Sequence, residues 1–177
     1  MTYAYAPQAP FAAWPKQLHE RELGFCIWYT SPGTIVTQTQ CPRATLELSQ
    51  TLGGRVYECL QACTETNRAL GGTLVVHDWR SLTEVDTEAR ADYTKRLEGL
   101  RRGQVREAVM AIPPQRALVR AAVHFASMVL PFRTGHRTRF VDDVDALRAT
   151  IADLRLAVPD PDEEVPGLDL LAAASAF

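Results

Sequence analysis

Residues 72–100 read GTLVVHDWRSLTEVDTEARADYTKRLEGL. The run Thr73–Trp79 is β-branched and apolar, without Pro or Gly, and predicts one buried strand. A polar bend follows it, and Asp86 then stands where its carboxylate can accept hydrogen bonds from the first turn of a helix. The apolar residues that follow have helical spacing: Ala89, Tyr93, Leu97 and Leu100. The stretch predicts a strand, a loop and a returning helix, with the loop where α/β folds usually hold their ligands.

The composition is that of an ordinary globular domain. Of the 177 residues, 46% are hydrophobic and 23% are charged, which is enough for one domain with a proper core. The formal net charge of −2 leaves no basic excess and argues against nucleic acid as a partner. The apolar runs are too short for a transmembrane helix, and the N-terminus lacks the basic leader and apolar block of a secretion signal. We therefore expect a cytoplasmic protein.

The chain divides into an arm, a domain and a tail. Residues 1–23 predict an extended arm whose aromatics dock on the domain or on a partner, namely Tyr3, Tyr5, Phe11 and Trp14. Residues 24–156 form the predicted domain. Residues 157–177 predict an acidic, Pro-containing linker and a short apolar tail. The apolar ends either close the core of a monomer or form a homodimer.

Turn signals and apolar periodicity place the elements before the central strand. Two strands, residues 25–30 and 34–39, flank Ser31-Pro32-Gly33, which predicts a hairpin. A helix capped by Ser49 follows and ends at Gly71-Gly72. The expected buried stripe of this helix is Leu52, Val56, Leu60 and Cys63, with Leu70 as a further candidate.

Strands and helices alternate in the second half. Residues 105–112 predict a strand and residues 115–130 a helix, whose expected inward face is Leu118, Ala122, Phe125, Ala126 and Val129. A strand at 138–141 precedes a last helix, capped by Asp142 or Asp143, whose stripe is Val144, Leu147, Ile151 and Leu154. These elements predict an α/β fold, with a mixed sheet of about five strands covered by about four helices.

The order of elements resembles the STAS domain, and in particular the bacterial group related to the anti-sigma-factor antagonist of sporulation. The CRAL-TRIO lipid-binding fold is related to the same group. Three segments carry the resemblance: LVVHDWRSLTEVDTEAR at 74–90, AVMAIPPQRALVRAAVHFA at 108–126 and RFVDDVDALRATI at 139–151. The resemblance as a whole covers about residues 25–156, and the order of elements carries the likeness rather than any single motif.

In phospho-regulated antagonists the helix start carries Asp, two serines and Gly, and a partner kinase phosphorylates the second serine. The corresponding residues here are Asp86, Thr87, Glu88 and Ala89. Glu88 thus stands where the phosphorylated serine would be. Its carboxylate carries less charge and fewer acceptor oxygens than a phosphate. Thr87 remains a candidate for phosphorylation. Glu88 is a candidate for a permanent negative charge in place of a phosphate.

Three functions compete. The leading hypothesis is a non-enzymatic regulatory or scaffold module that binds a protein, such as a regulatory kinase or another signalling component. Its expected contact residues are Arg80, Ser81, Thr83, Asp86, Thr87 and Glu88. The alternative is a carrier or sensor of an apolar, lipid-like ligand, with a wall formed by residues 117–130 and Phe132. The third, least favoured, is a hydrolase that uses His77, Asp78 or His124.

The sequence carries no nucleotide, nucleophile-elbow or zinc-protease motif, so we expect no cofactor. His77 and Asp78 are neighbours on a strand, point to opposite faces and cannot act as one pair. Cys59 and Cys63 are four apart on a helix, where we favour two small buried residues over metal ligands.

His136 lies in a basic loop with three arginines: Arg133, Arg137 and Arg139. The cluster is either an exposed turn, which we favour, or a site for an anion.

Overall fold

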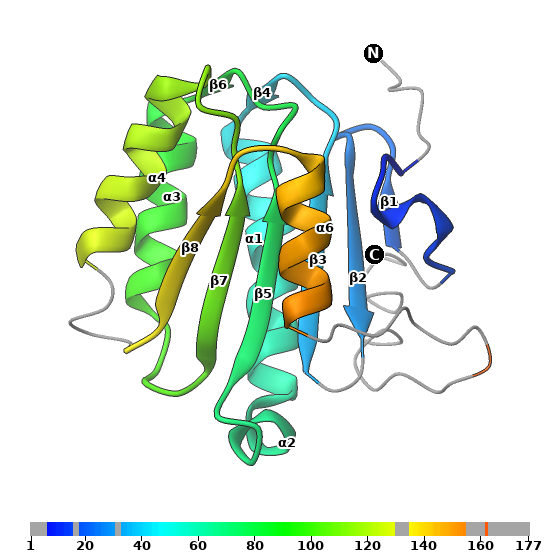
Figure 1. Cartoon of the computed structure of the whole chain (residues 1–177). Helices are drawn as coiled ribbons and strands as arrows, with labels where there is room; N and C mark the ends of the chain where they lie inside the picture. The colour runs from blue at the N-terminus through cyan, green and yellow to red at the C-terminus, as the bar shows by residue number, and fades with distance from the viewer. Residues whose placement is uncertain (1–6, 16–17, 31–32, 130–134, 155–161, 163–177) are drawn as a thin grey trace.

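The computed structural model describes residues 7–15, 18–30, 33–129, 135–154 and 162, with the backbone alone for residues 66 and 125–129. Six strands form one sheet in the order β1-β2-β3-β5-β7-β8 (Figure 1). Their bounds are Leu18–Glu20, Phe25–Thr30, Thr34–Thr39, Thr73–Asp78, Val105–Ala111 and Arg137–Val141. The strands from β3 to β8 run parallel, whereas β1–β2 and β2–β3 are antiparallel. The predicted α/β class and mixed sheet are confirmed.

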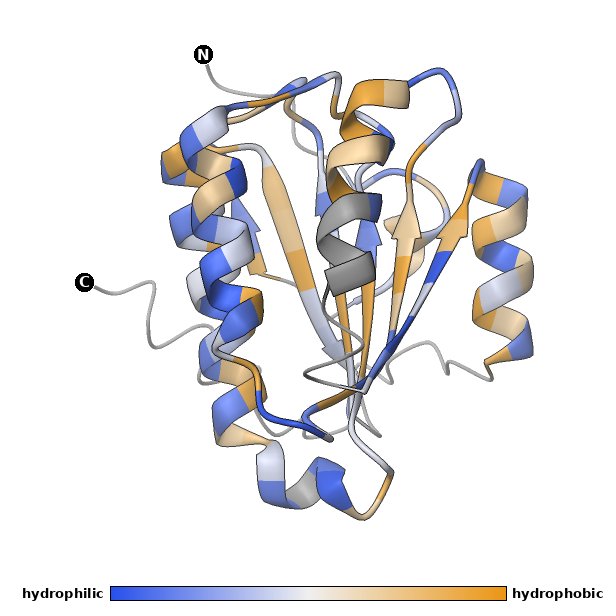
Figure 2. Ribbon diagram, turned by 90° about the vertical axis from the view of Figure 1, so that its left-hand side faces the viewer, coloured by the Kyte–Doolittle hydropathy of each residue, from blue (hydrophilic) through white to orange (hydrophobic). Residues whose placement is uncertain are grey.

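Helices cover both faces of this sheet. On one face lie α1 (Leu46–Ala62), α3 (Thr87–Glu98) and α4 (Ala117–Val129). The other face carries α6 (Val144–Asp153) and the 3₁₀ turn η1 (Phe11–Ala13). Figure 2 shows the hydrophobic strands between the two helical layers. Three short elements complete the fold: α2 (Thr64–Arg68), β4 (Arg43–Ala44) and β6 (Glu84–Val85).

The predicted central strand is confirmed as β5, which lies between β3 and β7 and is buried along its whole length. Alternate side chains of β5 enter the two separate cores of the domain. Val75 and Trp79 belong to the core beneath α1, whereas Leu74 and Val76 belong to the core beneath α6. A central strand buried on both faces needs the continuous apolar run that the sequence has.

The predicted hairpin is also confirmed, since β2 and β3 pair from Phe25↔Thr39 to Thr30↔Thr34. Gly33 has φ +72°, and a Cβ there would lie 2.6 Å from Oδ1 of Asn67, so both conformation and space favour Gly at this turn. Ser31 and Pro32 of the predicted turn lie outside the described residues.

Helix α1 begins earlier than the sequence indicated. Thr45, not Ser49, caps it, because Thr45 Oγ1 accepts a hydrogen bond from the N–H of Leu48 at 3.2 Å. Ser49 instead lies within the helix, and its hydroxyl donates to the carbonyl oxygen of Ala89 and to Asp92. The predicted stripe from Leu52 to Cys63 is buried, but Leu70 follows α2 and is 40% exposed.

The predicted inward face of α4 is wrong at Leu118, whereas Ala122 of that face is half-buried. Val119 and Val123 are buried, whereas Leu118 is 86% exposed. This helix is apolar on nearly every side, so hydropathy did not indicate which side packs against the sheet. The side chains of Phe125, Ala126 and Val129 lie outside the described residues.

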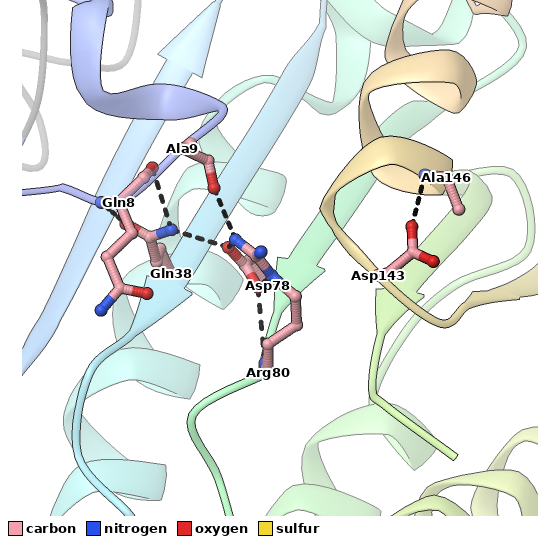
Figure 3. A network of polar contacts seen from close by, with 7 residues as sticks. All are labelled: Gln8, Ala9, Gln38, Asp78, Arg80, Asp143 and Ala146. Carbon is pink, nitrogen blue, oxygen red and sulfur yellow. Dashed lines mark hydrogen bonds and ion pairs between the residues drawn. The ribbon is translucent and has the colours of Figure 1, made fainter. Parts of the chain in front are cut away.

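The cap of the last helix and the docking of the arm are clear in the structure. Asp143 caps α6 by accepting a hydrogen bond from the N–H of Ala146 at 2.8 Å (Figure 3). Phe11 and Trp14 are buried and pack edge to face, and both rings contact Trp28 of β2. Within the described ranges, no helix is long and apolar enough to cross a membrane. Tyr3, Tyr5 and the predicted tail after 162 lie outside the description.

Candidate functional site

A partly enclosed, mostly apolar cavity of about 130 Å³ lies between the sheet and the helices α1, α3 and α4. Its floor is made by side chains of β5 and β7, among them Val75, His77 and Met110. Leu52 of α1 and Val123 of α4 belong to its walls. Protein interiors rarely leave a void much larger than a water molecule, so a cavity of this size in a core is a candidate binding site.

Small side chains account for the unfilled space. Ala108 on β7, Ala89 on α3 and Ala122 on α4 all line the cavity. Gly53 of α1 also lines it, but the space beside this glycine is taken by the side chain of Arg96, whose Cδ would lie 2.9 Å from a Cβ there. Larger residues at these facing positions would fill the gap between the layers. Local sequence patterns do not reveal the cavity, because the small residues that line it come from four elements that only the fold brings together.

His77 is the titratable side chain in the floor of the cavity. Its ring is 7% exposed, and its Nδ1 lies 2.7 Å from the hydroxyl of Thr37, the residue opposite it on β3. The ring lies against Trp79, with 4.8 Å between ring centroids. Burial lowers the pKa of His77 to about 4, so the ring is neutral at physiological pH.

Asp78 lies on the opposite face of β5 and has a different environment, as the alternation of the strand predicted. Its carboxylate accepts hydrogen bonds from Nε and Nη2 of Arg80, both at 2.7 Å, and from Nε2 of Gln38 at 2.6 Å (Figure 3). Arg80 also donates to the carbonyl oxygen of Ala9, and the N–H of Gln8 donates to Gln38 at 2.8 Å. The network ties the segment before η1 to the ends of β3 and β5, which is a structural role.

The loop and helix start that the sequence singled out, residues 80–88, are anchored by the chain itself. Asp86 stands at the N-cap position of α3, as predicted, but its carboxylate makes no cap hydrogen bond and instead accepts one from Nε of Arg43 at 2.7 Å. Thr83 donates its hydroxyl hydrogen to the carbonyl oxygen of Pro42, and β6 pairs with β4. Local sequence patterns predict neither the pairing of Asp86 with the distant Arg43 nor the short strand pair of β4 and β6.

The other predicted partner-binding residues in the segment 80–88 differ in their exposure to solvent. Arg80 is engaged with Asp78, and its side chain is 19% exposed. Ser81 is half-buried, whereas Thr87 and Glu88 are exposed at the start of α3. Residues 80–88 also contribute Leu82 and Val85 to the wall of the cavity.

Two of the three arginines of the predicted anion cluster are described, and both belong to β8. Arg137 is exposed, whereas Arg139 is paired with Glu107 at 3.0 Å and with Asp153 at 3.5 Å. His136 is buried and lines the cavity, and Arg133 lies outside the described residues.

The two neighbouring cysteines on α1 are core residues. Cys59 and Cys63 are both buried, and a hydrogen bond to Cys63, together with burial, raises the pKa of the Cys59 thiol. Among the described residues, no group of three His, Cys, Asp or Glu side chains is placed to hold a metal ion. His124, the second histidine of the hydrolase hypothesis, is exposed on α4 and contacts Phe140.

Comparisons with protein-family models, with curated proteins and with solved structures give no match. The STAS resemblance thus remains a prediction from the order of elements. The fold class rests on the structure itself, and the function on the geometry of the site.

Proposed function

We propose that this chain is a non-enzymatic binding protein that holds a small apolar ligand in the cavity between the sheet and α1, α3 and α4. The observation that carries this proposal is the volume of about 130 Å³ with a mostly apolar lining. Apolar cavities of roughly 150 Å³ are known to stay dry and to bind molecules as large as benzene. The cavity therefore has room for one molecule of about that size.

The polar groups near the cavity support binding rather than hydrolysis. General acid–base chemistry needs a group whose pKa lies near the working pH, and burial holds His77 well below it. The neighbouring carboxylate of Asp78 lies on the other face and is neutralised by Arg80. Among the described residues that line it, the cavity therefore offers shape and apolar contact, with neither an activated nucleophile nor a base paired to one.

A cavity-filling substitution tests this proposal. Ala122→Leu on α4 places three additional carbons in the wall and is expected to abolish binding of toluene, measured by calorimetry on the full chain. Ala121→Leu, next to it on the exposed side of α4, is the matched control and leaves toluene binding intact. Equal binding by the two variants, or no binding by the original chain, would contradict the proposal.

Protein binding through residues 80–88 is the second candidate. The observation in its favour is that Leu82 and Val85 line the cavity while Thr87 and Glu88, a few residues on, are exposed. A ligand in the cavity would then contact the same loop that meets the partner, which suits a regulatory or scaffold module. Exposure also leaves Thr87 accessible to a partner kinase.

The variant Thr87→Ala/Glu88→Ala tests this surface without breaking the Arg43–Asp86 ion pair. It is expected to lose a partner recovered by crosslinking from native extract, whereas the control Arg68→Ala, on the distant α2, retains it. Recovery of the same partner by both variants would show that another surface is used.

A further inference from the structure

We propose that the ligand of the cavity carries one uncharged hydroxyl group, as a phenol does, and that this hydroxyl binds Nε2 of His77. The inference rests on the proposed function, because it names the ligand class of the same cavity. It follows from the hydrogen bonding of His77, from the sign of the charges around the cavity and from its size.

The first step is the hydrogen bonding of the His77 ring. The ring lines the cavity, is more than nine-tenths buried and is held by Thr37 through Nδ1. Among the described residues, Thr37 supplies the hydrogen bond to the ring through Nδ1, and Nε2 is not one of the fully enclosed side-chain atoms without a partner. Nε2 thus keeps accessible surface although the residue as a whole is buried. Polar atoms of buried side chains are almost always hydrogen-bonded in native proteins, to protein or to water. A ligand group that bonds to Nε2 would take the place of such a water.

The second step is the choice of a hydroxyl. If the hydroxyl of Thr37 donates to Nδ1, the neutral ring carries its hydrogen on Nε2 and presents a donor to the cavity. If Nδ1 donates to Thr37, then Nε2 presents an acceptor. A ligand hydroxyl can accept a hydrogen bond in the first case and donate one in the second. It fits both tautomers, whereas a carbonyl oxygen fits only the first.

The third step is the absence of charge on the ligand. Moving an ion into a mostly apolar cavity is costly unless an opposite charge meets it. His77 supplies none, since burial lowers its pKa to about 4. The guanidinium of Arg96 also lines the cavity, but it is already paired with the carboxylate of Asp92 at 2.9 Å. Arg90 lies at the edge of the cavity and is exposed to solvent, where its attraction for an anion is screened.

The fourth step is size and shape. A volume of about 130 Å³ accepts one six-membered ring. The rings of Trp79 and Tyr93 meet edge to face in the cavity wall, with 5.5 Å between centroids, and add an aromatic surface beside His77. A phenol combines the ring that this space accepts with the single hydroxyl that Nε2 would bind.

The test compares phenol with toluene, which replaces the hydroxyl by a methyl group of similar size. Calorimetry on the full chain gives both dissociation constants for the original protein, for His77→Phe and for the control His124→Phe on the exposed side of α4. The preference for phenol over toluene is expected to fall about fivefold in His77→Phe, the worth of one neutral hydrogen bond. It should remain unchanged in His124→Phe, and benzoate should bind at least about tenfold more weakly than phenol.

The outcomes separate this inference from the proposed function. If toluene binds and the preference for phenol does not change in His77→Phe, or if benzoate binds as well as phenol, the inference is wrong and the apolar binding site stands. If neither toluene nor phenol binds the original chain, both fail. His77→Gln, which keeps a donor and an acceptor near the same place, covers the case that His77→Phe does not fold. It is expected to keep part of the preference for phenol, and complete loss would count against a hydrogen bond at this position.

Discussion

Thr37 and His77 lie opposite each other on neighbouring parallel strands, and the hydroxyl of Thr37 lies 2.7 Å from Nδ1 of His77. The pair orients the one histidine of β5 toward the cavity floor. Because the ring is buried there in its neutral form, its ionisation is coupled to folding. The same geometry therefore affects both the stability of the protein and the ligand that the cavity can hold.

The first prediction concerns pH. The folded-state pKa of His77, about 4, lies below the value of 6.5 for an unperturbed histidine. Between these values the unfolded chain binds the proton and the folded chain does not, so the stability present above pH 6.5 is lost as the pH falls toward 4. The loss attributable to His77 amounts to about 3 kcal/mol. Urea unfolding of the original chain and of His77→Phe across this range measures it.

The control for this prediction is the difference between the two proteins. Burial also lowers the pKa of His19 and His136, so the original chain has other sources of acid sensitivity. His19 and His136 contribute equally to the pH dependence of the original chain and of His77→Phe, so their effect cancels in the difference between the two proteins. Parallel curves of unfolding free energy against pH would show that His77 is not the buried neutral histidine described here.

The second prediction concerns the buried ion pair. Asp78 is 2% exposed and accepts hydrogen bonds from Arg80 and Gln38. Asp78→Ala leaves a partly buried guanidinium without its counter-charge and should lower the free energy of unfolding by about 3 kcal/mol. Glu65→Ala breaks the exposed pair with Arg68 and should change stability very little. Similar effects of the two substitutions in chemical unfolding would contradict the assigned role of Asp78.

The third prediction tests which side of α4 packs on the sheet. Val119→Ala removes two buried methyl groups and should lower the free energy of unfolding by about 2 kcal/mol. Leu118→Ala removes a larger side chain that is 86% exposed and should have almost no effect. A larger loss of unfolding free energy in Leu118→Ala than in Val119→Ala would show that α4 packs on the sheet through the face that hydropathy alone indicates.

Residues whose environment is set by near neighbours could be predicted from the sequence. The continuous apolar run of β5 and the pairing of β2 with β3 beside Gly33 depend on local chemistry, and both form where expected. Asp143, one of the two caps that the sequence allowed for the last helix, is the one that forms. The start of α1 was missed because Thr45 and Ser49 are both acceptable caps. Only tertiary packing decides between them.

The candidate site was harder to predict, because it depends on distant residues and on missing volume. The sequence singled out His77 but not Thr37, its hydrogen-bond partner, which lies forty residues earlier. It placed Asp86 as a helix cap, whereas Arg43 binds that carboxylate. Ala89, Ala108 and Ala122, from three different elements, all line the cavity, and no local pattern predicts that small side chains face one another across a core.

The most direct test of the central claim, an apolar ligand site between the sheet and its helices, is a methyl NMR titration of the full chain with toluene. We predict saturable shifts, with one ligand per chain, in the methyl groups of Val75, Val123 and Met110, which line the cavity. Val36 and Leu147, in the core on the other face of the sheet, should not shift. Equal shifts in the two cores, or no saturable shift in either, would contradict the account.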